Sequence, residues 1–190
     1  MKKLILFLIL IMSLSITSFS ETTNFQLGLT PTLNINQGED VKGVRIPVLF
    51  GTTEKVTGVD FNIFASDVDE FTGLQGGIFL GAGIFNKVNT RFKGVGLGLI
   101  NLHGGSSEGF LFGVENHTNE FTGLKVGGFN YSKSKSSYEF GLINYSKEAF
   151  FQFGALNIAE HINGVQIGFL NFARNGVLPV MPFVNFNWQL

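Results

Sequence analysis

The sequence predicts an all-β protein, an antiparallel meander of about 11–12 repeat strands that closes into a β-barrel. Three observations point to this class. Apolar residues occupy alternate positions along most of the chain, a unit ending in asparagine recurs, and 25 glycines and 22 phenylalanines accompany a charged fraction of only 14% in 190 residues. A hydrophobic fraction of 44% supplies enough apolar surface for folding, so a disordered chain is excluded.

Residues 1–20 are predicted to be a secretory signal peptide. Two lysines precede an apolar run at 4–12, and small residues around Ser20 suit cleavage after that position. The run is shorter than the roughly 20 residues that cross a membrane as a helix, although a permanent N-terminal anchor is the alternative. We therefore expect a single repeat-built β domain over 21–190, exported to the outer membrane or cell surface of a bacterium.

The early part of this domain follows the repeat imperfectly. An N-terminal strand is expected around 24–36. Three units, at 44–50, 59–65 and 74–80, keep the apolar alternation but lack the closing asparagine. An extra segment at 81–86 then breaks the count, and it either lengthens one strand or begins a short hairpin.

The repeat unit is clearest at 164–171, where GVQIGFLN has apolar residues at alternate positions, a central glycine and a final asparagine. The closing asparagines recur every 13 to 15 residues and are Asn86, Asn101, Asn116, Asn130, Asn144, Asn157, Asn171 and Asn185. A period of two within each unit indicates strands rather than helices. Self-similarity at a fixed step indicates a fold built from repeated copies of one unit.

The two faces of the predicted strands differ. The first face is apolar and carries Val95, Leu97, Leu99, Phe110, Phe112, Val165, Ile167 and Phe169. The second face carries glycines and polar groups, among them Arg45, Asp60, Lys125, Glu139, Gln152 and Gln166. In a barrel the first face would meet lipid and the second would line a narrow lumen. In a soluble repeat sheet the first face would be a packed core.

Aromatic residues gather near the expected strand ends. They are Phe71, Phe92, Phe121, Phe150, Tyr131, Tyr145, Phe172 and Trp188. In a membrane barrel these side chains would form girdles at the two interfaces, whereas in a soluble sheet they would pack along its edges.

Two alternatives to the barrel remain open. A β-solenoid-like repeat sheet would explain why all units look alike, because equivalent positions would stack into asparagine and glycine ladders. It requires a corner at the central glycine, since a strand of about nine residues advances about 30 Å and about five residues cannot return that far. A soluble sandwich fits less well, because it needs one consistently polar face on each strand.

Several segments resemble the surface-repeat family of exported bacterial β proteins. They are the units GVGLGLIN at 94–101 and GVQIGFLN at 164–171, with the closing segment PVMPFVNFNW at 179–188. The resemblance covers most of the chain after the signal peptide, and the three early units depart from it. It implies a repeat-built β protein at a bacterial envelope or surface, and it brings no catalytic residues.

No catalytic, cofactor-binding or metal-binding residue is predicted. His103, His117 and His161 are interpreted as solvated loop residues, and the chain has no cysteine to complete a zinc site. The acidic run at 67–70 lacks the glycine-centred loop of an EF-hand. A net charge of −1, with basic residues scattered along the chain, excludes the charge pattern of a nucleic-acid binder.

We therefore expect a non-catalytic outer-membrane or cell-surface protein with a structural or interaction role, no cofactor, and outer-membrane lipid as its partner. Two alternative functions remain open. One is a narrow outer-membrane pore, and the other is a secreted soluble β-solenoid that binds a partner.

Overall fold

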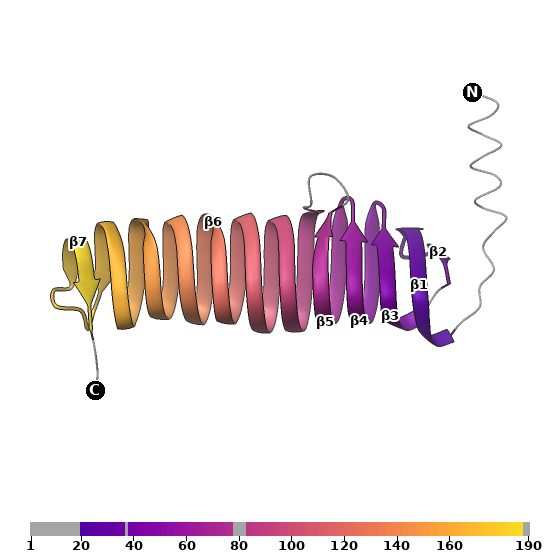
Figure 1. Ribbon diagram of the computed structural model, residues 1–190, viewed down its shortest axis with the longest axis horizontal. Coiled ribbons are helices and arrows are strands. Elements are labelled where there is room, and N and C mark those ends of the chain that lie inside the picture. The colour runs from indigo at the N-terminus through magenta and orange to yellow at the C-terminus, as the bar shows by residue number, and fades with distance from the viewer. Residues whose placement is uncertain (1–19, 37, 78–82, 188–190) are drawn as a thin grey trace, which may run out of the picture.

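The computed structural model describes residues 20–36, 38–77 and 83–187, and this part of the chain winds into one elongated β-solenoid (Figure 1). Every regular element in these ranges is a strand, so the all-β prediction is confirmed. The barrel prediction is wrong, and the repeat solenoid, the alternative, is correct. The predicted signal peptide lies outside the described residues except for Ser20. Residues 78–80 of the unit at 74–80, residues 81–82 of the extra segment at 81–86 and Trp188 also lie outside them.

Seven strands make a single sheet in the order β2-β1-β3-β4-β5-β6-β7. Their bounds are β1 Ser20–Thr30, β2 Leu33–Ile35, β3 Gly38–Pro47, β4 Phe50–Asn62, β5 Ala65–Gly77, β6 Gly83–Ala173 and β7 Val180–Phe186. From β1 through β3, β4 and β5 to β6 all pairings are parallel, which a meander of hairpins cannot produce. The short strands β2 and β7 pair antiparallel with the two ends and cover part of their open edges.

The solenoid is possible because each coil has more bends than the single corner, at the central glycine, that the sequence analysis requires. Along 110–124 buried and outward residues alternate, but the alternation breaks near 114–115, 119–120 and 122–124, where neighbouring residues all face outward. Each break is a bend, so one coil has three short sides instead of one long strand and its return. In Figure 1 the 91-residue strand β6 accordingly appears as a continuous coil.

The glycines hold two different places in the coil. Gly109, at the bend that opens a unit, has φ of 128°, and a Cβ there would lie 2.0 Å from the carbonyl oxygen of Gly94 in the preceding coil. A Cβ at the central Gly113 would lie inside the solenoid, 2.5 Å from the carbonyl oxygen of Gly98 and 2.8 Å from Nδ2 of Asn101. The bend therefore follows the central glycine, and the glycine itself makes room for the asparagine side chains.

The interior combines buried polar residues, which occur in coils along its whole length, with two apolar clusters. One cluster lies at the N-terminal half and consists of Val41, Val56, Val68, Phe71, Val88, Phe92, Leu111 and Phe121. The other lies near the C-terminal end and consists of Ala149, Ala159, Ile162 and Ala173. The interface-girdle prediction is thus wrong for Phe71, Phe92 and Phe121, because all three side chains are buried inside the coil.

Candidate functional site

The polar residues predicted to line a lumen are packed against one another in the solenoid interior. The six are fully or almost fully buried and comprise Arg45, Asp60, Lys125, Glu139, Gln152 and Gln166. Nη1 of Arg45 lies 3.2 Å from Oδ2 of Asp60 one coil away and donates to the hydroxyl of Ser66 at 2.9 Å. Burial lowers the pKa of Arg45, and the neighbouring Asp60 carboxylate opposes that shift. The prediction that these groups line a lumen is wrong, since they hold neighbouring coils together.

A second buried ion pair joins two later coils. Nζ of Lys125 lies 2.9 Å from Oε1 of Glu139, and neither side chain reaches the surface. Glu139 also accepts bonds from the Ser146 hydroxyl at 2.7 Å and from Nε2 of Gln152 at 2.6 Å. Burial lowers the pKa of Lys125, while attraction to Glu139 counteracts this. Such a pair is tolerated because each charge has a partner and further hydrogen bonds.

The repeat asparagines stack into a ladder beside these pairs. In the chain of bonds from Asn86 to Asn171, Nδ2 of each asparagine donates to Oδ1 of the asparagine in the next coil, at 2.8 to 2.9 Å. From Asn101 to Asn157 the same amide also donates to a backbone carbonyl of the following coil. From Asn101 to Asn157 the oxygen and the nitrogen of every ladder amide are thereby hydrogen-bonded, which is what a buried amide requires.

The three histidines occupy different environments. His103 is buried, contrary to its interpretation as a solvated loop residue; its ring lies 4.4 Å from that of Phe92, and Nδ1 lies 3.1 Å from the Ser107 hydroxyl. Burial lowers the pKa of His103 to about 3, with a smaller contribution from Lys125. His161 is exposed. Within residues 20–36, 38–77 and 83–187, no group of three or more His, Cys, Asp or Glu side chains could hold a metal ion.

The apolar face predicted from the sequence forms one outer side of the solenoid, here called side 1. Its residues are half-buried or exposed in every coil and comprise Val44, Ile46, Val48, Val59, Phe61, Ile63, Leu74, Val95, Leu97, Leu99, Phe110, Phe112, Val114, Leu124, Val126, Gly128, Tyr138, Phe140, Leu142, Phe151, Phe153, Ala155, Val165, Ile167 and Phe169. None of them is charged. The ring centroid of Phe140 lies 5.5 Å from that of Phe151 and 6.0 Å from that of Phe153, so the rings of successive coils are in contact. The expectation that this face would be the core of a solenoid is therefore wrong.

The next outer side, side 2, changes character across its width. Next to side 1 it carries a mainly apolar row, which is Ile100, Glu115, Phe129, Ile143, Leu156 and Leu170. The middle row is Leu102, His117, Tyr131, Tyr145, Ile158 and Phe172. The third row is polar in every coil except at Gly104 and consists of Gly104, Asn119, Lys133, Lys147, Glu160 and Arg174. Glu115 is the charged member of the first row, and Nε2 of His117 lies 3.2 Å from its carboxylate.

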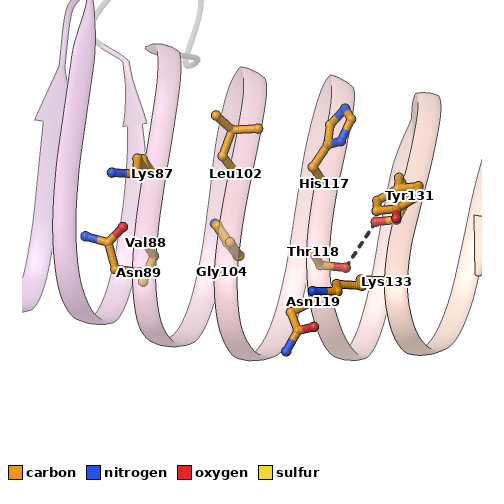
Figure 2. Close-up of a pocket in the computed structure, with 11 residues that line it drawn as sticks. Lys87, Val88, Asn89, Leu102, Gly104, His117, Thr118, Asn119, Tyr131 and Lys133 are labelled. Atoms are coloured by element: carbon orange, nitrogen blue, oxygen red, sulfur yellow. Dashed lines mark hydrogen bonds between the residues drawn. The ribbon is translucent and has the colours of Figure 1, made fainter.

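A shallow groove of about 460 Å³ interrupts side 2. Figure 2 shows Lys87, Leu102, His117 and Tyr131 along its upper row, with Asn89, Gly104, Asn119 and Lys133 below. Gly104 has no side chain in the row where neighbouring coils carry Asn89 and Asn119, and this opens the groove. Asn89 is already engaged, because its Nδ2 donates to Asp67 at 2.9 Å and to Asp69 at 2.7 Å.

Together these features define a parallel β-solenoid with a polar, hydrogen-bonded interior and an apolar outer side. No protein-family model, curated protein or solved structure matches the chain. Among the described residues there is no helix long and apolar enough to cross a membrane.

Proposed function

We propose that this protein is an exported, non-catalytic scaffold of a bacterial outer membrane or cell surface, and that it acts by attaching through side 1. The single observation that carries the proposal is the uncharged row of outward apolar residues in every coil from Val44 to Phe169. Monomeric soluble proteins rarely expose a contiguous apolar patch of more than a few hundred Å², and a larger one marks a site of interaction.

The placement of the polar residues supports a non-catalytic role. The carboxylates of Asp60 and Glu139 and the amine of Lys125 are bound to one another or to neighbouring hydroxyls and amides inside the coil, where a substrate has no access. A group that acts as acid, base or nucleophile must reach the atom it attacks. These side chains therefore act as structural contacts between coils.

The location at the envelope rests on the N-terminal residues and on the family resemblance. The two lysines followed by an apolar run are typical of a secretory signal, and the repeat units resemble those of exported surface proteins. The chain has no cysteine, so its stability outside the cell depends on the buried ladders and ion pairs rather than on disulfides.

The test is fractionation of the native host followed by mass spectrometry of the isolated protein. We expect a mature chain that begins at Glu21, recovered with the envelope and degraded when intact cells are treated with an external protease. A cytoplasmic marker protein that survives the same treatment is the control. Recovery of the unprocessed chain, starting at Met1, with the soluble contents of the cell would contradict the proposal.

A second candidate is a secreted binding module, and the groove above Gly104 favours it. Two aromatic rings of this groove, His117 and Tyr131, lie 5.6 Å apart beside the amide of Asn119, so the lining combines stacking and hydrogen-bonding groups. The fractionation also separates this candidate from the first, because a secreted module would be recovered in the culture medium and not with the envelope.

A further inference from the structure

The exposed apolar surface turns a corner, and this limits what can cover it. Side 1 continues into the first row of side 2, as at Leu142 and Ile143, two consecutive residues that both face outward and are 68% and 39% exposed. The same happens at Phe169 and Leu170. A second copy of the chain could place its flat side 1 against this side 1, but the row around the corner would stay in water. A fluid apolar phase would cover both surfaces.

The side chains beyond the corner follow the order found at a membrane interface. In two adjacent coils the sequence across side 2 runs from Phe129 to Tyr131 to Lys133, and from Ile143 to Tyr145 to Lys147. The two tyrosine rings are stacked with centroids 5.2 Å apart, so they form a short aromatic row. Tyrosine favours the headgroup level of a membrane, and lysine extends its amine to the polar side of it.

The remaining outer side, side 3, is polar and charged. Lys93 and Glu108 pair there at 3.3 Å with both side chains about 60% exposed, and Lys55 pairs with Glu70 at 3.0 Å. Its outward positions in the middle coils are mainly polar and comprise Ser106, Glu108, Glu120, Thr122, Ser134, Lys135 and Ser137. A structure that is apolar on one side and charged on the opposite side is suited to lie in a membrane interface.

We propose that the solenoid lies along a lipid surface, with its long axis in the membrane plane, side 1 and the apolar residues of the adjoining row in the acyl region, and side 3 in water. Glu115, the charged residue of that row, reaches the headgroup level beside His117. This inference rests on the proposed function and names the partner of side 1 as lipid. Tyr131 and Tyr145 lie at the headgroup level, and Lys133 and Lys147 reach the phosphates. The chain does not cross the bilayer in this arrangement; it is held on one leaflet.

Single-cysteine labelling tests the orientation directly, because the chain has no cysteine of its own. The mature chain would carry Phe112→Cys or Leu142→Cys on side 1, and Ser106→Cys or Thr122→Cys on side 3 as matched controls, each labelled with an environment-sensitive fluorophore. All four parent side chains are exposed, so the substitutions leave the interior intact. The vesicles would contain phosphatidylcholine alone, or phosphatidylcholine with one quarter phosphatidylglycerol.

On addition of either vesicle, we expect emission from the two side 1 labels to rise several-fold and to be quenched by lipids with a doxyl group on the acyl chain. The two control labels should not change. The anionic vesicles should bind more tightly, and Lys133→Gln together with Lys147→Gln should remove that difference while binding to phosphatidylcholine persists.

Two results would overturn the inference. One is an equal response, or none, from labels on both sides. The other is a side 1 signal that rises with protein concentration without vesicles, together with a disulfide between two copies of the Leu142→Cys variant, which would identify a second copy as the occupant. Neither result changes the expected outcome of the fractionation. If the chain is still recovered with the envelope, it is attached through a protein partner and not through lipid. Recovery of the unprocessed chain with the soluble contents of the cell would instead mean that the proposed function has failed.

Discussion

Nδ2 of Asn130 donates to Oδ1 of Asn144 at 2.8 Å, although the two residues are 14 positions apart in the chain. The same amide donates to the carbonyl oxygen of Phe140 at 3.0 Å. One side chain therefore connects its own coil to the next through both a side chain and the backbone. Because the bond repeats from coil to coil, the asparagine that closes each unit sets the register of the solenoid.

Replacing one member of this ladder should destabilise the fold. In Asn130→Ala, Oδ1 of Asn144 and the carbonyl of Phe140 lose a donor in the buried interior, which costs about 1–3 kcal/mol of unfolding free energy. Urea unfolding of the variant and the parent measures the difference. Asn163→Ala is the control, since Asn163 is exposed and outside the ladder, and it should leave stability nearly unchanged. Equal effects from both variants would contradict a special role for the ladder.

The ion pair between Lys125 and Glu139 gives a second test. Lys125→Met leaves the Glu139 carboxylate buried without its counter-charge, and we expect a loss of about 3–5 kcal/mol. Combining it with Glu139→Gln removes both charges while an amide still bonds with Ser146 and Gln152, so stability should return to within about 1 kcal/mol of the parent.

A cycle of urea unfolding on the two single variants and the double variant measures this coupling. Leu111, which is buried one coil before Lys125 in the equivalent position, shows that an apolar side chain fits there. If the double variant were as unstable as Lys125→Met alone, the loss would have come from packing and not from the unpaired charge.

The division of each strand into two faces could be predicted from the sequence, because a period of two places alternate residues on opposite sides however the strands pair with one another. Val165 and Gln166 do lie on opposite sides, one half-buried at the surface and the other in the interior. Which side faces inward could not be predicted. The buried Gln166 is stable there only because its Nε2 donates to Oε1 of Gln152 in the neighbouring coil, at 2.8 Å. That partner comes within reach only when the coils stack on one another.

The sequence pattern does not predict the bends, for a related reason. The segment after each asparagine keeps the alternation, so it reads as a continuation of the same strand. The sequence feature that marks a bend is the pair of adjacent apolar residues before the asparagine, such as Leu142 and Ile143, where the alternation fails. Two successive outward residues are a bend in this structure, whereas in a barrel they would have placed one apolar side chain in the lumen.

We expect substitution of the glycine that opens a unit to destabilise the fold. Gly109→Ala combines φ of 128° with a Cβ 2.0 Å from the carbonyl of Gly94, so the strain alone should cost about 1–3 kcal/mol and the collision adds to it. Gly128→Ala is the matched control, because its Cβ would lie 3.1 Å from the carbonyl of Val114 on an outward position. Thermal unfolding compares the two. A control that is destabilised as much as Gly109→Ala would show that any added Cβ disturbs the coils.

The buried His103 should make the fold sensitive to mild acid. Its pKa is lowered to about 3 in the folded state by burial, against the ordinary value of 6.5, so between these values the unfolded chain binds a proton that the folded chain does not. The linkage of His103 alone therefore makes stability highest above pH 6.5 and lowers it as the pH drops toward 3, by about 1.4 kcal/mol for each unit once the unfolded histidine is protonated. The ring lies against Phe92, Nδ1 lies 3.1 Å from the Ser107 hydroxyl, and Lys125 adds a smaller lowering of the pKa, so none of these groups is an acid that would hold the imidazolium in place.

The measurement is the urea midpoint between pH 8 and pH 4 for the parent and for His103→Thr, the side chain that the next coil carries at the equivalent buried position, Thr118. We expect the variant to lose less stability than the parent between about pH 6.5 and pH 4, because the proton linkage of this one residue is removed. His161→Thr, at an exposed position, should keep the slope of the parent. Parallel curves for the parent and His103→Thr would contradict the prediction, because they would show that the pKa of His103 does not differ between the folded and unfolded states.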